Sequence, residues 1–209
     1  MAMYLPKPTE TDFELPPPGT FLAVCYRVLD LGTQDTTYKG TPKRQHKILI
    51  SWELPEEKMK DGRPFTISQR YTWSMSEKAT LRKNLESWRG EPFAEKDFGQ
   101  GGFDIKNILG KGCLLTIVHT NKGDKNYANI ASISRIMKGM TVPAAANEKV
   151  FLGLNNDDFD QPVFFKLSDN LQNTIKASPE YQEMVNGYSG PAEGPVADAK
   201  DFHDDEIPF

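Results

Sequence analysis

Apolar and polar residues alternate along the first part of the chain in a way that predicts β-strands. The stretch 20–29 is long, aromatic and β-branched, which favours a first strand, and a polar, turn-rich stretch, 32–45, follows it. In 46–54 every second residue is apolar, as in a strand with one buried face. After a turn at Asp61-Gly62, residues 65–73 repeat this alternation. We therefore predict three strands, of which the second and third are neighbours.

After residue 73 the spacing of the apolar residues changes from every second residue to the spacing of a helix. Leu81, Leu85 and Trp88 recur at helical spacing, and a glycine and a proline directly after them end the pattern. Ser74 and Glu77 stand three residues apart in front of it, which is the pattern of a capping box. We predict a helix here, the best defined in the chain.

Two further strands are predicted after a glycine-rich connection and a short helix candidate. They cover 112–120 and 127–133 and are joined by a turn at 121–124. Three strands, one helix and two strands is the order of the five-stranded oligonucleotide-binding (OB) barrel, whose helix lies between strands three and four. Another small β-barrel, or a half-open sheet with an inserted helix, is the alternative. We expect a mainly β protein with an OB-fold barrel.

The pattern is weaker beyond Gly139. Val163–Phe165 suggests an extra strand, and two short helix candidates follow at Asp169–Lys176 and Pro179–Asn186, the second with Ser178 as its cap. No periodic pattern remains from residue 187 onward. This part therefore predicts a small extension that ends in a tail.

Four segments follow from these patterns. At 209 residues the chain can bury one substantial core, either as one domain with extensions or as a domain of about 140 residues plus a smaller unit. We favour the first organisation. Its segments are an extended, proline-rich N-terminal arm at 1–18, an OB domain at 19–139, an extension packed on the barrel at 140–186, and a disordered acidic tail at 187–209.

Charge is divided unevenly between the two ends of the chain. Residues 1–139 hold 21 Lys and Arg against 16 Asp and Glu, a net charge of +5, whereas residues 140–209 hold 4 against 13, a net charge of −9. A basic body with an acidic tail is compatible with a polyanionic partner despite the net charge of −4. The tail can also compete with nucleic acid for a basic groove.

Cysteine usage and hydropathy indicate a reducing compartment. Cys25 and Cys113 lie in apolar runs rather than in a close pair, so we expect buried, reduced thiols. The chain shows no secretory signal and no run of 18 apolar residues. We expect a cytoplasmic protein with no membrane partner and no cofactor.

Cations and aromatic side chains occur where the groove of an OB barrel would form. Binding of single strands needs cations for phosphates and exposed rings for bases. Trp52, Tyr71 and Trp73 share the parity of core residues, so packing and base stacking both remain open for them. A solvated surface charge is the alternative for each lysine. The candidate nucleic-acid-binding residues are Tyr38, Lys39, Lys43, Arg44, Lys47, Trp52, Arg70, Tyr71, Trp73, Lys122, Lys125 and Tyr127.

Other groupings of chemically active residues are weaker. Asp157, Asp158 and Asp160 resemble the carboxylates of a metal-dependent nuclease but lack a companion Glu or His cluster, and an acidic surface loop is the simpler interpretation. The three histidines are too scattered for a zinc site, and residues 99–102 lack the Gly-Lys-Ser/Thr of a phosphate-binding loop. We expect no catalytic residues and no metal.

The last residues of the chain combine charge with apolar side chains that have no local partner. The tip consists of Asp204, Asp205, Glu206, Ile207, Pro208 and Phe209. It closely resembles the C-terminal tip of bacterial and phage single-stranded-DNA-binding proteins, in which an acidic tail ending in Ile-Pro-Phe docks partner proteins. A frayed acidic end is the simpler alternative.

The resemblance implies a non-enzymatic protein that coats and protects unwound DNA during replication, recombination and repair, and that recruits replication and recombination proteins through its tip. It is strongest at the tip and architectural over residues 19–136. The divergent body suggests a phage origin, for which the expected compartment is the cytoplasm of the bacterial host, and it leaves self-association open. A strand-annealing mediator, or a metal-dependent nuclease that uses residues 157–160, are the alternative functions.

Overall fold

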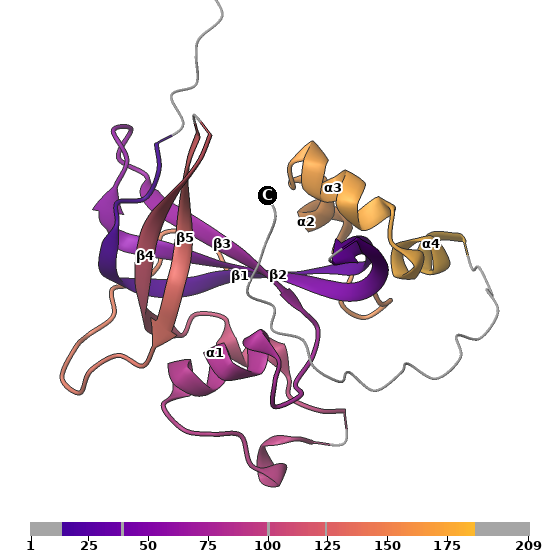
Figure 1. Cartoon of the computed structure of the whole chain (residues 1–209), viewed down its shortest axis with the longest axis horizontal. Helices are drawn as coiled ribbons and strands as arrows, with labels where there is room; N and C mark the ends of the chain where they lie inside the picture. Colours follow the sequence, from indigo (N-terminus) through magenta and orange to yellow (C-terminus); the bar gives the residue numbers. More distant parts are fainter. Residues whose placement is uncertain (1–13, 39, 100, 124, 187–209) are drawn as a thin grey trace, which may run out of the picture.

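A mainly β architecture is seen in the computed structural model, which describes residues 14–38, 40–99, 101–123 and 125–186 (Figure 1). Five strands pair in the antiparallel order β3-β2-β1-β4-β5, and a sixth, β6, pairs in parallel with β1. The strands are β1 (Gly19–Tyr38), β2 (Thr41–Lys58), β3 (Pro64–Thr72), β4 (Gly112–Lys122), β5 (Lys125–Ser134) and β6 (Val150–Leu152). The predicted order of three strands, one helix and two strands is thereby confirmed.

The prediction of a polar turn region at 32–45 is wrong. β1 and β2 continue as a hairpin to the pair Tyr38↔Thr41. Residues 32–45 therefore form a projecting β-hairpin, the arm, which is distinct from the N-terminal arm (Figure 1). Its threonines are β-branched and favour strands, although the stretch has no alternating apolar residues. The ladder of β1 and β2 shifts register between Cys25 and Arg27 and again between Asp30 and Gly32. Such bulges bend a strand and change the direction in which its side chains point.

The predicted helix is present as α1 (Thr80–Arg89) and buries Leu81, Leu85 and Trp88. Gly90 ends it in the left-handed conformation with a φ of 79°, as the sequence predicts. The capping-box prediction is wrong, because the N-cap is Ala79 and no side chain caps it. Ser74 instead accepts a hydrogen bond from the backbone N–H of Ser76, in a turn ahead of the helix. Two 3-10 turns, η1 (Glu95–Asp97) and η2 (Ile105–Ile108), connect α1 to β4.

The main core lies between the strands and α1. The inward-facing residues of β2, among them Ile48, Ile50 and Trp52, pack with Leu115 of β4 and with Trp88 of α1. Cys25 and Cys113 are buried, free thiols, as predicted. Burial raises the pKa of Cys25 to about 12. These thiols are therefore protonated core residues rather than reactive ones.

A second apolar cluster lies on the other face of β1 and β2. Leu29, Leu49, Leu152, Phe164 and Ile175 form its centre. β2 is thus buried on both faces over residues 48–55, where Ser51 and Glu53 are buried as well, and the expectation of a strand with one buried face is wrong for this part. Glu53 accepts hydrogen bonds from the backbone N–H groups of Ala146 and Asn147, both at 2.8 Å, and from the Asn147 side chain at 2.6 Å. These donors supply the partners that a buried carboxylate needs.

Three short helices form the C-terminal part of the described chain and lie beside the arm, away from α1 (Figure 1). α3 (Asp169–Lys176) and α4 (Pro179–Asn186) have the predicted bounds, and Ser178 accepts a hydrogen bond from the backbone of Tyr181 at 3.3 Å. The strand prediction for Val163–Phe165 is wrong, because these residues belong to α2 (Gln161–Phe165). Asp160 caps this helix at 2.9 Å and Pro162 occupies its first turn. None of the helices in the described part is long and apolar enough to cross a membrane.

Candidate nucleic-acid interface

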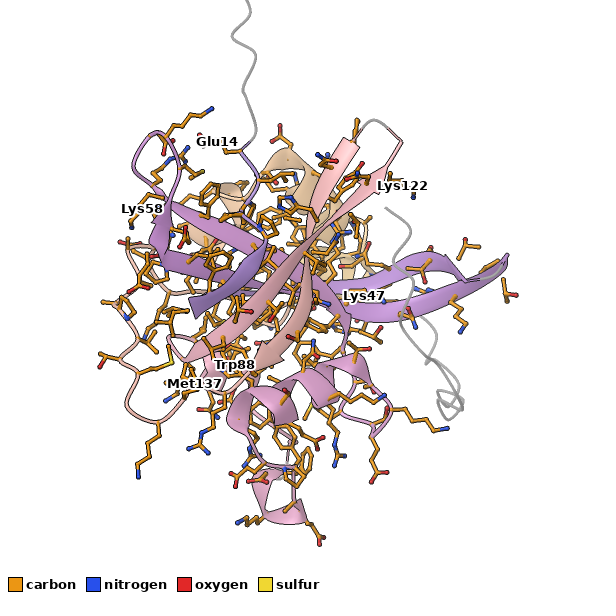
Figure 2. The ribbon with its side chains drawn as sticks, turned by 60° about the vertical axis from the view of Figure 1, so that its left-hand side comes forward. Glu14, Lys47, Lys58, Trp88, Lys122 and Met137 are labelled. Carbon is orange, nitrogen blue, oxygen red and sulfur yellow. The ribbon has the colours of Figure 1, made fainter. Side chains whose placement is uncertain are left out.

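The outer face of β3 and the neighbouring end of β2 carry one group of the predicted binding residues. Arg70 and Thr72 point outward from β3, while Tyr71 between them points into the core. Lys47 pairs with Thr72 across the ladder, and its ammonium donates to the Thr72 hydroxyl at 2.8 Å. Figure 2 shows Lys47 where the arm leaves the body of the sheet. Two cations and a hydroxyl are thereby placed on one exposed surface.

Trp73 presents an exposed ring next to His46, the neighbour of Lys47 in β2. It follows the last residue of β3 and keeps 48% of its surface exposed, which is large for a tryptophan. Its backbone N–H donates to the carbonyl of His46 at 2.7 Å, and its ring centroid lies 5.1 Å from that of His46. The ring is therefore held in place at one side while the rest faces solvent. This is the geometry that base stacking requires.

Trp52 and Tyr71 belong to the core, so the stacking alternative does not hold for them. Trp52 is fully buried and lies 5.9 Å from Trp88, ring centroid to ring centroid. Tyr71 is 3% exposed, and its hydroxyl donates to Gln69 and accepts from Asn84. Burial raises the pKa of Tyr71 above its usual range. Alternation holds inside both strands, whereas Trp73 lies past the strand end, where alternation no longer applies.

The arm carries a second group of the predicted binding residues. Arg44 forms an exposed ion pair with Asp35 at 3.4 Å, and Lys43 faces Thr36 across the ladder. Tyr38 is paired through its backbone with Thr41. The Tyr38 side chain and the whole of Lys39 lie outside the described residues. The arm thus brings Lys43 and Arg44 to its outer part, beyond Lys47.

The β4–β5 hairpin carries the third group of the predicted binding residues. Lys122 pairs with Lys125 at its end, and Tyr127 pairs with Thr120. Both lysines are exposed and Tyr127 is half-buried. Figure 2 shows Lys122 at the tip of this hairpin, on the opposite side of the molecule from α1. The hairpin and the arm are separate projections from the sheet, and the surface of Lys47, Arg70 and Trp73 lies at the base of the arm.

One cluster at the base of the arm was not predicted. His46 Nε2 lies 2.6 Å from an Asp30 oxygen, and His46 Nδ1 lies 3.4 Å from Glu180 of α4. Glu180 also accepts hydrogen bonds from the backbone N–H of Thr33 at 2.8 Å and from its hydroxyl at 2.5 Å. The cluster therefore ties α4 to both strands of the arm. Glu180 stands 134 positions after His46, and no local pattern indicates that pairing.

The cluster shifts the titration of two of its members. Burial lowers the pKa of His46, but the hydrogen bond and charge of Asp30 and the charge of Glu180 outweigh it, so the pKa of His46 is raised. Burial raises the pKa of Glu180, but its hydrogen bonds from Thr33 and the charge of His46 outweigh that effect and lower it. The protonated imidazole is thus favoured between two carboxylates.

The acidic loop at 157–160 is occupied by structural contacts. Asp158 pairs with the ammonium of Lys106 and with the Asn155 amide, and Asp160 caps α2. Across the described residues, no group of three His, Cys, Asp or Glu side chains is arranged to hold a metal ion. Two of the three aspartates that suggested a nuclease therefore have roles in the fold.

The C-terminal tip, Asp204 to Phe209, lies outside the described residues, as does most of the N-terminal arm. Its docking role stays a prediction of the sequence. No protein-family model matches the chain, and a search of curated proteins finds no similar sequence.

Proposed function

We propose that this chain is a single-stranded-DNA-binding protein with an OB-type barrel. Three features of the sheet support this fold. β1 pairs with both β2 and β4, the helix α1 lies between β3 and β4 in the chain, and β3 approaches β5. In an OB barrel the ligand lies across strands two and three and between the loops that join strands one to two and four to five. Here both of those connections are projecting hairpins.

The exposed Trp73, at the end of the strand pair that carries Lys47 and Arg70, is the observation on which the proposal rests. An exposed ring offers a stacking surface to any base, and cations of the same strand pair are available to phosphates. Lys43 and Arg44 on the arm, and Lys122 and Lys125 on the β4–β5 hairpin, extend the positive charge along two directions. Contacts of these kinds are independent of base sequence, as coating of unwound DNA requires.

The C-terminal tip supports a second proposed role, the recruitment of partner proteins. A terminal phenylalanine can enter an apolar pocket of a partner while its carboxylate and the preceding acidic residues meet cations around that pocket. We propose that the tip recruits replication, recombination and repair proteins in this way. The resemblance of the tip to those of bacterial and phage proteins of this class points to the same setting.

A titration of fluorescent single-stranded and double-stranded oligonucleotides at several salt concentrations tests the DNA-binding proposal. We expect tight binding to single strands, weak binding to duplex, and an affinity that falls steeply with salt because counterions are released. Equal affinity for both forms at low salt would overturn it. A sample with Mg²⁺ or Mn²⁺ serves as control, in which the labelled strand is expected to keep its length.

A further inference from the structure

An apolar pocket with a cationic rim lies at the α1 end of the molecule, away from the proposed DNA interface. Its volume is about 330 Å³, within the range of about 300–1,000 Å³ that is usual for ligand pockets. The apolar part of the lining comes from α1, from the segment between α1 and β4, and from the residues after β5. Its apolar members are Leu85, Trp88, Phe93, Phe103, Ile108 and Ile136.

Three cations line the same pocket. Arg89 is already engaged, since it pairs with Glu91 at 2.9 Å and Asp97 at 3.1 Å and lies over the ring of Phe93. Lys111 and Arg135 are exposed and form no ion pair with any residue that the structure describes. The pocket therefore combines an aromatic interior with two cations that can accept an anionic ligand.

We infer that this pocket binds the C-terminal tip of its own chain. The tip has the matching chemistry, because Phe209 and Ile207 are apolar whereas the terminal carboxylate and Asp204 to Glu206 are anionic. Phe93 and Phe103 already meet edge to face, with centroids 5.0 Å apart, and an aromatic ring is a favourable addition to such a pair. Aromatic contacts and opposite charges thus point to the same occupant.

The tail is long enough to reach the pocket within one molecule. Twenty-three residues follow Asn186, and an extended segment of that length spans about 75 Å. A folded body of this size has a radius of gyration of about 16 Å, so any point of its surface lies within that reach. Attachment to the same chain also gives the tip a high effective concentration, which favours docking within the molecule over docking between molecules.

Docking at this pocket has a different consequence from competition for the DNA interface. Figure 2 shows Trp88 on α1, at the opposite end of the sheet from Lys122 and away from Lys47. A tip held there leaves the surface of Lys47, Arg70 and Trp73 open. It is itself withheld from partner proteins, so the pocket regulates recruitment rather than DNA binding. The effect on recruitment rests on the proposed role of the tip, whereas docking of the tip at the pocket does not depend on the proposed DNA-binding function.

Photo-cross-linking in the full-length protein tests this inference. Phe209 is replaced by a photoreactive benzoyl-phenylalanine, the sample is irradiated, and the linked peptides are identified by mass spectrometry. We expect links to the pocket segments 85–112 and 135–136, in a product of monomer mass whose yield does not depend on protein concentration. Links to the arm or the β4–β5 hairpin, links only between two chains, or an absence of links within the protein would each overturn the inference.

Charge reversal of the rim supplies the matched comparison. The double variant Lys111→Glu/Arg135→Glu is expected to lower the cross-linking yield at least fivefold. The control Lys83→Glu/Lys138→Glu changes the net charge equally at exposed positions that do not line the pocket, and is expected to keep the yield. Equal yields in both variants would contradict a role for the rim. Unchanged thermal unfolding shows that each variant is folded, and oligonucleotide titration of the same variants reports separately on DNA binding.

Discussion

At the scale of single residues, the proposed DNA interface depends on side chains that the sheet directs outward. Arg70 lies on the exposed face of β3, and Lys47 lies opposite Thr72 on the same face. Trp73 follows the strand and keeps an exposed ring next to His46. Each of these residues is therefore expected to make a separate, measurable contribution to binding.

Replacement of Arg70 by alanine is expected to weaken binding to single strands of every sequence. The loss of one phosphate contact reduces the slope of log affinity against log salt by about 1. Arg63→Ala is the matched control, because Arg63 is an exposed arginine at the other end of β3 that pairs with Asp61. Oligonucleotide titrations at several salt concentrations measure both variants. An equal loss in both would show that Arg70 contributes only general charge.

Replacement of Trp73 by alanine is expected to cost about 1–3 kcal/mol of binding free energy, the contribution of one stacked base. Trp73→Phe keeps an aromatic ring and is expected to retain most of the affinity. Trp52 and Trp88 are buried, so Trp73 is expected to provide most of the fluorescence quenching on DNA binding. Quenching that persists in Trp73→Phe would contradict its position in the interface.

At the scale of secondary-structure elements, the arm formed by β1 and β2 is held between the sheet and the C-terminal helices. The cluster of Leu29, Leu49, Phe164 and Ile175 packs one face of the arm base. Polar contacts from Glu180 to Thr33 and His46 fix α4 at the same place. The helices therefore support the segment of β2 that carries Lys47 and that contacts Trp73 through His46.

The attachment of α4 is expected to depend on pH through His46. Its folded-state pKa is raised, so protonated His46 contributes stability that is fully present below its ordinary pKa of about 6.5 and is lost as pH rises through the higher folded-state pKa. Glu180, whose pKa is lowered, stays ionised over this window. Urea midpoints of the wild type should therefore exceed those of His46→Gln by more at pH 6 than at pH 8. A difference that is constant across this range would contradict the assignment.

At the scale of the whole molecule, the charges of the chain are segregated. The net charge is +5 over residues 1–139 and −9 over residues 140–209. A basic body can approach a polyanion while the acidic end remains available for cationic surfaces, whether on a partner or at the pocket beside α1. The overall charge of −4 hides this division.

Deletion of Ile207 to Phe209 is expected to abolish recruitment of partner proteins while DNA binding stays intact or becomes tighter. The deletion removes the apolar anchor but leaves the sheet and its cations unchanged. A pull-down of known replication and repair proteins, with an oligonucleotide titration in parallel, measures the two activities. Unchanged recruitment would refute the docking role of the tip, whereas loss of DNA binding would show that the tip acts on the interface.

The sequence by itself determined the features that depend on local periodicity. Alternation located the strands that became β2 and β3, and helical spacing located Leu81, Leu85 and Trp88, because burial of one face imposes a period on neighbouring residues. The same parity left packing and base stacking both open for Trp52, and the structure buries it. The C-terminal tip is likewise defined by its own residues, although it lies outside the described part.

Only the tertiary structure decided which outward faces are covered and which stay exposed. Ser51 and Glu53 have the spacing of solvent-facing residues, yet both are buried. Glu53 lies against Ala146 and Asn147 of the segment after β5, and Ser51 contacts Arg27 and Ser68. The pairing of His46 with Glu180 joins residues far apart in the chain, and the exposure of Trp73 follows from where the β3 ladder ends. Periodicity carries information about one face of one element, whereas packing between distant segments decides what lies against the other.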